Sequence, residues 1–196
     1  MAVNLQKGQK INLKKESGQA LSVVTVGLGW DVSAGGSGLI AMLRGKNIDC
    51  DASAFLLTNG RLADKSDIVS FTNLTHKSKA VQHMGDNLTG EGEGDDEQIH
   101  VDLMSVPAQY DKIVFVVNIF RAKNRSQHFG LVKNAFIRIV DNQGKEFCRY
   151  NLSENYDGMM AMIFGEIYRY KGEWKFNAIG QGTKDEDIEG LARRYQ

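Results

Sequence analysis

Residues 85–97 restrict the fold of this chain more than any other stretch, because they combine acidic side chains with glycines and contain almost nothing that could enter a core. The carboxylates are ionised near neutral pH and repel one another, and the stretch has no lysine or arginine to offset them. Its glycines let the backbone turn sharply, so that carbonyl and carboxylate oxygens can point to a common centre. A divalent cation with about six to eight oxygen ligands is the natural counter-charge, and calcium tolerates irregular geometry better than magnesium does.

The same composition has a simpler interpretation, since acidic, glycine-rich runs are most often solvated loops or linkers. The stretch also matches an EF-hand loop in length, with Asp86 at position 1 and Glu97 at position 12. However, Leu88 and Gly90 offer no side-chain oxygen at positions 3 and 5, and Glu91 stands where an EF-hand needs glycine. An EF-hand is therefore excluded, and the composition alone leaves both a metal-binding loop and a solvated loop open.

Two further segments place carboxylates on or next to expected strands. Residues 48–54 alternate in polarity, which puts Asp49 and Asp51 on one face of a strand, about 7 Å apart. Like charges at this spacing are destabilising unless the face is solvated or a cation lies beside them. Asp31 follows a Gly-Leu-Gly-Trp bend at the exit of an apolar strand. Together with residues 85–97, three segments are then expected to bring acids to one place.

Short runs of alternating or apolar residues recur along the chain and predict strands. They cover residues 3–5, 11–13, 21–28, 48–57, 68–71, 80–84, 99–103, 112–120, 135–140, 147–152, 159–170 and 173–179. Only residues 185–195 have a helical pattern, with acids at the start and arginines at the end, as the helix dipole favours. This pattern predicts an all-β fold, a β-sandwich of two antiparallel sheets with a short C-terminal helix. No repeat or boundary divides residues 1–196, which are expected to form a single domain.

Composition and motifs argue against several classes of function. Lys plus Arg and Asp plus Glu are both 24, and this zero net charge gives no reason to expect a nucleic acid as partner. The histidines lack metal-ligand spacing, and nucleophile elbow, P-loop and dinucleotide motifs are missing from the sequence. Residues 1–15 do not resemble a signal peptide and no apolar run reaches about 20 residues, so a cytoplasmic protein is expected. Cys50 and Cys148 are then expected to be buried and reduced.

Two other segments each have two interpretations. Residues 33–47 contain a Gly/Ser-rich loop followed by a short apolar run, which either folds back on the domain or forms an exposed tip for a partner or a membrane surface. Tyr168, Tyr170 and Trp174 lie among basic residues on the last hairpin. They fit ordinary cross-strand packing, and also a surface that stacks a base or contacts a partner.

Five motifs together resemble the TerD family of bacterial tellurite-resistance and stress proteins. They are residues 25–31, 49–53, 85–97, 134–138 and 172–176, and the likeness spans nearly the full chain. The resemblance implies a β-sandwich that binds two neighbouring calcium ions and has no established enzymatic activity. It also implies resistance to tellurite, chemical stress and phage, with TerB-like proteins and a TerC-like membrane protein as partners. Contact with the inner face of the membrane would then be indirect or peripheral.

The resemblance also implies which residues bind the ions. Carried onto this sequence, the expected metal ligands are Asp31, Asp49, Asp51, Asp86, Asn87, Asp95, Asp96 and Glu97. Glu91 and Glu93 are further candidates at positions where the family varies, and backbone carbonyls of residues 85–97 are expected to contribute. Residues 33–47 depart from the family pattern, because they are longer and more apolar than the usual connection.

Three functions therefore compete. The first is a non-enzymatic module that calcium orders for interaction with a partner. The second is a calcium-dependent membrane or lipid adaptor, suggested by the apolar run in residues 33–47. The third is a metal-dependent hydrolase using paired carboxylates such as Asp95 and Asp96, for which the sequence offers no base or nucleophile motif.

Overall fold

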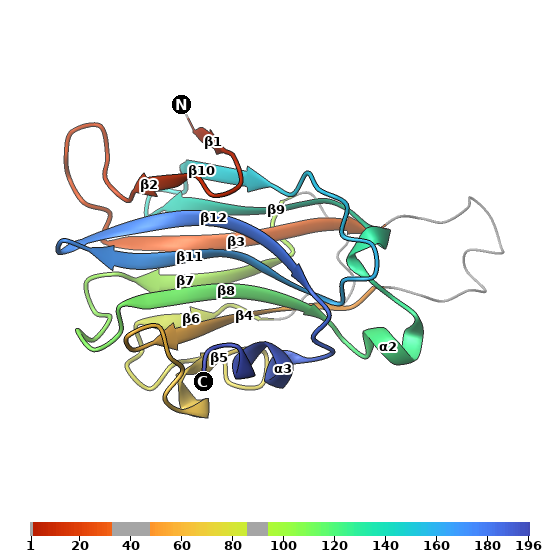
Figure 1. The fold of residues 1–196 in the computed structure, drawn as a ribbon. Coiled ribbons are helices and arrows are strands. Elements are labelled where there is room, and N and C mark those ends of the chain that lie inside the picture. Colours follow the sequence, from red (N-terminus) through yellow and green to blue (C-terminus); the bar gives the residue numbers. More distant parts are fainter. Residues whose placement is uncertain (1, 33–47, 86–93) are drawn as a thin grey trace.

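The computed structural model describes residues 2–32, 48–85 and 94–196, which form two six-stranded sheets packed as a β-sandwich (Figure 1). Sheet A comprises, in spatial order, β1 (Val3–Leu5), β10 (Glu146–Asn151), β9 (Val132–Asp141), β3 (Val23–Val32), β7 (Glu97–Asp102) and β6 (Val81–His83). Sheet B comprises β2 (Lys10–Asn12), β12 (Glu173–Thr183), β11 (Ala161–Tyr170), β8 (Lys112–Ile119), β4 (Cys50–Leu57) and β5 (Ile68–Val69). The predicted sandwich is confirmed, and β1 with β10 forms one parallel pair among antiparallel ones.

Helical structure is limited to short elements in the described residues. These are the 3-10 turns η1 (Lys65–Asp67) and η2 (Phe129–Leu131) and the α-helices α2 (Ala122–Arg125) and α3 (Ile188–Arg193). Helix α3 confirms the predicted C-terminal helix, and Asp187 caps it by accepting a hydrogen bond of 2.7 Å from the Gly190 amide. The expectation of a single helix is wrong, because α2 is a second one. Its four residues are too few to show a helical period in the sequence. No helix in the described part of the chain is long and apolar enough to cross a membrane.

Sheet B is buried on both of its faces over much of its area. Its inner face and that of sheet A form the main core between the sheets, with Val26 of β3 and Phe115 of β8 fully buried. On the outer face, Phe55 and its neighbours pack under Leu191 of α3, and the Phe55 ring meets Tyr195 edge-on at 6.0 Å. This double burial explains why β8 is an almost unbroken apolar run.

The outer face of sheet A is polar and carries the features that matter for function. Because Val24, Val26 and Leu28 of β3 face the core, the alternation of side chains turns Gly27 and Gly29 to the outer face. β6 and β7 are neighbours in sheet A, and the described residues between them are Met84, Gly85 and residues 94–96. In Figure 1 the end of β3 and the start of β4 lie on the right, at the end of the sandwich that carries α2. The three acid-bearing segments therefore meet at one end.

Candidate metal centre

A cleft of about 640 Å³ at the end of sheet A contains two of the predicted carboxylates, Asp31 and Asp96. Asp31 accepts a hydrogen bond of 2.6 Å from the side-chain amide of Asn134. Asp96 accepts one of 2.6 Å from the backbone amide of Trp30, and its own amide donates to the Leu28 carbonyl at 2.8 Å. Asn151 also lines the cleft. Carboxylate and amide oxygens of this kind are the donors that calcium prefers.

The electrostatics of this cleft disfavour a negative charge on Asp96. Burial raises the pKa of Asp96, the Trp30 amide opposes the rise, and the charges of Asp31 and Asp95 add to it. A nearby cation would act in the opposite direction and favour the ionised form. The donor set and its field therefore fit a divalent cation.

A second group of predicted acids surrounds the start of β4. Asp51 is 5% exposed, and its carboxylate lies 3.4 Å from the side-chain amide nitrogen of Asn118. Glu97 is buried and accepts a hydrogen bond of 2.5 Å from the backbone amide of Ala52. Glu97 also lies 3.4 Å from Nε2 of His83. Asp49, just before β4, lies 4.0 Å from Nη1 of Arg125. The alternative of a solvated strand face is wrong, because Asp51 and Ser53 are buried and Asp49 is half-buried.

The pKa of the Cys50 thiol is affected by the charges of several of these acids. Burial raises its pKa well above the ordinary value, and the charges of four carboxylates raise it further; they are Asp51, Glu97, Asp49 and Asp96. Because Asp96 is also close enough to Asp31 for their charges to interact, acids from β3, β4 and the approach to β7 share one region. Burial likewise raises the pKa of Cys148 to about 12, so both cysteines are buried thiols, as predicted.

Asp95 is placed differently from its neighbours. Its side chain is only 1% exposed, and its two oxygens accept hydrogen bonds from Nε and Nη2 of Arg138 at 2.6 and 3.0 Å. The bonds to Asp95 raise the pKa of the Arg138 guanidinium, with burial opposing. Arg138 also donates to Glu146 at 3.2 Å. The counter-charge that residues 85–97 lack is thus supplied in part by a strand 43 residues away.

The predicted ligand set is only partly visible. Asp86, Asn87, Glu91 and Glu93 lie outside the described residues, as does the 33–47 segment. Within residues 2–32, 48–85 and 94–196, no group of three or more His, Cys, Asp or Glu side chains is arranged to hold a metal ion. Asp31 and Asp96 share a cleft, Asp49, Asp51 and Glu97 lie around Cys50, and Asp95 is paired with Arg138. The complete ligand set remains a prediction.

Comparison with known proteins decides the family, since the TerD domain model matches residues 1–195. The chain belongs to the TerD family. It is 50% identical over 200 residues to stress response protein SCP2 of Bacillus subtilis (strain 168), covering all of both chains. It is 47% identical over 184 residues to tellurium resistance protein TerD of Serratia marcescens, covering 93% of this chain and 91% of the relative. The fold is shared with a homologue of telluride resistance protein (TerD) from Streptomyces coelicolor A3(2), with a TM-score of 0.66, 18% identity and coverage of 90% and 99%.

Sequence reasoning missed two residues of this TerD domain that support the acids. Asn134 binds Asp31 from a position with φ of 50°, where the pairing of β3 with β9 shifts register, and Arg138 binds Asp95. The alternation along β9 does place both on one face, which was the available signal. The alternation does not identify Asp31 and Asp95 as the partners, because these two residues lie on other segments.

On the last hairpin of this TerD domain, Arg169 and Trp174 take part in ordinary packing, whereas Tyr170 is 49% exposed with Lys175 4.5 Å from its ring centroid. The Arg169 guanidinium stacks 4.1 Å from the ring centroid of Trp174 and donates to the Val106 carbonyl at 2.8 Å. Trp174 donates to the Leu103 carbonyl at 3.0 Å. These groups are therefore used within the fold.

Proposed function

We propose that this TerD-family chain is a non-enzymatic, calcium-binding stress-response protein, in which the ion orders residues 85–97 into an interaction surface. The observation that carries the proposal is the convergence of carboxylates from three segments: Asp31 and Asp96 line one cleft, and the charge of Asp96 acts on the Cys50 thiol together with those of the acids at β4 and β7. Relatives named for tellurium resistance and stress response support the biological context. A role in tellurite or chemical-damage resistance follows for this chain.

The physical argument rests on unbalanced charge. Like charges brought together in partly buried surroundings destabilise the fold unless a cation lies among them. Asp31 and Asp96 would hold the ion from the cleft, and Asp49, Asp51 and Glu97 from the side of β4. Asp86, Asn87, Glu91 and Glu93 would complete the set from the acidic segment. Arg138 supplies a positive charge to Asp95, and bound calcium would add positive charge beside Asp31 and Asp96 in the cleft.

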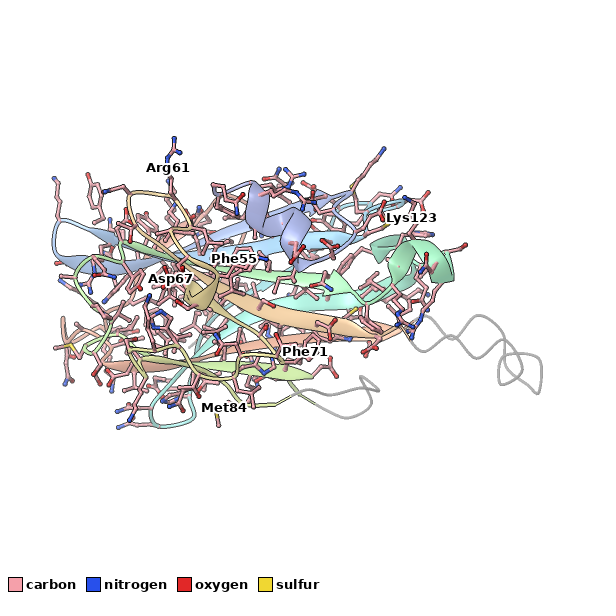
Figure 2. The ribbon with its side chains drawn as sticks, turned by 90° about the horizontal axis from the view of Figure 1, so that it is seen from below. Phe55, Arg61, Asp67, Phe71, Met84 and Lys123 are labelled. Carbon is pink, nitrogen blue, oxygen red and sulfur yellow. The ribbon has the colours of Figure 1, made fainter. Side chains whose placement is uncertain are left out.

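Exposed apolar side chains after the edge strands β5 and β6 support an interaction role. Phe71, Leu74 and Met84 are 44%, 46% and 61% exposed, and Met84 directly precedes the glycine that opens the stretch. Figure 2, a view from below, labels Phe71 and Met84, which follow the edge strands β5 and β6. A TerB-like protein or a TerC-like membrane protein is the partner that the family suggests.

Calcium titration by calorimetry, with thermal unfolding as a second readout, tests the proposal. The wild type should bind calcium and gain thermal stability, while Asp96→Asn should bind at least about tenfold more weakly, because affinity depends on ligand charge. Glu173→Gln is the matched control. Glu173 is the first residue of β12, pairs with Lys14 and is not among the residues that line the cleft. A wild type without binding heat or thermal shift at millimolar calcium would contradict the proposal.

A calcium-dependent lipid adaptor is the second candidate. Phe120 is partly exposed beside α2, with the guanidinium groups of Arg121 and Arg125 5.0 and 5.5 Å from its ring centroid. An aromatic ring flanked by cations suits an anionic membrane surface. Co-sedimentation with phosphatidylserine vesicles, with calcium and with chelator, tests it, and equal pelleting in both conditions would rule it out.

A further inference from the structure

Three consecutive acids at the end of the acidic stretch point to three different surroundings. Asp95 lies on the outer face of sheet A against Arg138. Asp96 lies in the cleft beside Trp30 and Asp31. Glu97 reaches across to the Ala52 amide of sheet B. The three carboxylates therefore make different contacts, and Asp95 is the one bound in bidentate geometry by an arginine.

The surface of sheet A is shaped to receive the Asp95 carboxylate. Any Cβ atom at Gly27 would collide with that carboxylate, and one at Gly29 would meet the Phe136 ring and lie 2.9 Å from the Gly94 carbonyl. The two glycines of β3 thus let residues 94 and 95 lie directly on the strand. Gln98 donates a further hydrogen bond of 3.0 Å to Asp95.

Arg138 is itself fixed by its neighbours on the sheet. Its Nη1 donates to Glu146, which also accepts a hydrogen bond of 3.0 Å from Arg149. The Arg149 guanidinium lies 3.9 Å from the Phe136 ring centroid. Because these groups belong to β9 and β10, the guanidinium that meets Asp95 is held by two paired strands of sheet A.

We propose that Asp95 is a positioning residue and not a calcium ligand: Arg138 fixes it on sheet A, and this ion pair sets where Asp96 enters the cleft. The inference rests on the proposed calcium function and deepens it. Both Asp95 oxygens are engaged by Arg138, whereas Asp96, one residue later, faces the oxygen donors of the cleft. The ion pair forms with or without calcium, and Asp95 is therefore held on sheet A before the ion binds.

The sign of the charge effect separates this proposal from its main competitor. Arg138→Gln removes a positive charge, which by simple repulsion would tighten calcium binding. If the ion pair positions the ligands, the same change weakens binding about 10-fold to 100-fold, as loss of a supporting partner does at metal sites. Lys133→Gln is the matched control, because Lys133 is exposed on the same strand and lies opposite Asp31 in the β-ladder. It should leave the affinity unchanged or slightly higher.

Calorimetry on the full chain should then show a defined pattern. Asp95→Asn and Arg138→Gln each weaken binding similarly, the double variant is no weaker than either, Arg138→Lys recovers part of the affinity, and Asp96→Asn weakens it most. In nitrogen-15 spectra, the Arg138 Nε proton should exchange slowly in calcium and in chelator alike. Tighter binding by Arg138→Gln, or fast exchange of that proton only with calcium, would overturn the proposal and make Asp95 a ligand that leaves Arg138.

Failure of the parent proposal remains distinguishable. A wild type that binds no calcium would remove both the calcium function and the positioning role. The ion pair is measured separately by urea unfolding of the two single variants and the double variant in chelator. Non-additive shifts of the unfolding midpoint support the pair, and additive shifts would overturn it even in a protein that binds calcium.

Discussion

Two aspartates of this TerD domain, Asp67 and Asp96, show opposite responses to burial. Burial raises the pKa of Asp67, but hydrogen bonds from Lys77, Tyr110 and His76 outweigh it, so that the pKa lies below its ordinary value. The pKa of Asp96 is raised, because burial is reinforced by the charges of Asp31 and Asp95. Matched donors favour the charged form of a buried carboxylate, whereas neighbouring like charges disfavour it.

The Asp67 cluster shows what a matched set looks like. Oδ1 of Asp67 lies 2.7 Å from the Tyr110 hydroxyl, 2.8 Å from Nζ of Lys77 and 3.3 Å from Nε2 of His76. The His76 ring meets the Tyr110 ring edge-on at 5.2 Å, and its Nδ1 lies 2.7 Å from the Ser78 hydroxyl. Figure 2 labels Asp67, which ends the η1 turn. These contacts join η1 both to the segment after β5, which carries His76 and Lys77, and to Tyr110 just before β8.

The largest expected effect comes from removing the matched carboxylate. Asp67→Ala leaves the buried imidazole and the Tyr110 hydroxyl without their acceptor, and the free energy of unfolding should fall by about 3 kcal/mol or more. Urea unfolding in chelator measures it. Glu189→Ala is the control, because Glu189 pairs with Lys65 at the exposed surface and should matter little. Equal losses in the two variants would break the comparison.

Gly27→Ala should give the next largest effect. Its new Cβ atom would displace the Asp95 carboxylate from Arg138, and overpacking of this kind destabilises by about 1–3 kcal/mol. Calcium affinity should fall with it. Thr25→Ala, on the same strand and face, is the control for the side-chain change. Unchanged unfolding and calcium affinity in Gly27→Ala would show that residues 94 and 95 do not rest on β3.

Asp96→Asn should have the opposite sign to Asp67→Ala when measured without calcium. Removing one of several clustered like charges should raise the free energy of unfolding in chelator by roughly 0.5–1 kcal/mol, although the same change weakens calcium binding. Asp31→Asn should act in the same direction. Loss of stability in chelator for both variants would mean that these acids are already matched within the fold.

The last expected effect is a dependence of stability on pH near the matched cluster. Burial lowers the pKa of His76 against the opposing effect of Asp67, while Lys77 adds to the lowering. The unfolded chain therefore takes up a proton below about pH 6.5, where the native chain does not, and stability falls as the pH falls through that value. The slope from this proton is at most about 1.4 kcal/mol per pH unit.

His76→Gln should flatten the dependence of the urea midpoint on pH between about 6.5 and 5. Asp67 contributes separately, at lower pH. Because its pKa is depressed in the fold, it adds stability above the unfolded pKa of about 3.9, and this stability is lost as the pH falls through the folded pKa. An unchanged slope in His76→Gln would assign the dependence to another group.

The strands of this domain were predictable because side-chain polarity directly records which face of a sheet is buried. Strands β7 and β8 lie close to their expected bounds. Alternation left two alternatives open at β4, a solvated face or a face beside a cation, and the burial of Asp51 and Ser53 removes the first. Helix α2 was missed because four residues show no helical period.

The sequence by itself determined the sandwich, the crowding of acids in residues 85–97 and the need for some counter-charge, since these depend on composition and local alternation. Only the tertiary structure decided the surroundings of the described acids. Asp95 pairs with an arginine 43 residues away, and Asp96 shares a cleft with Asp31. The order of the strands in the two sheets brings these groups together, and a pattern of period two, which records faces but not neighbours, contains no information about that order.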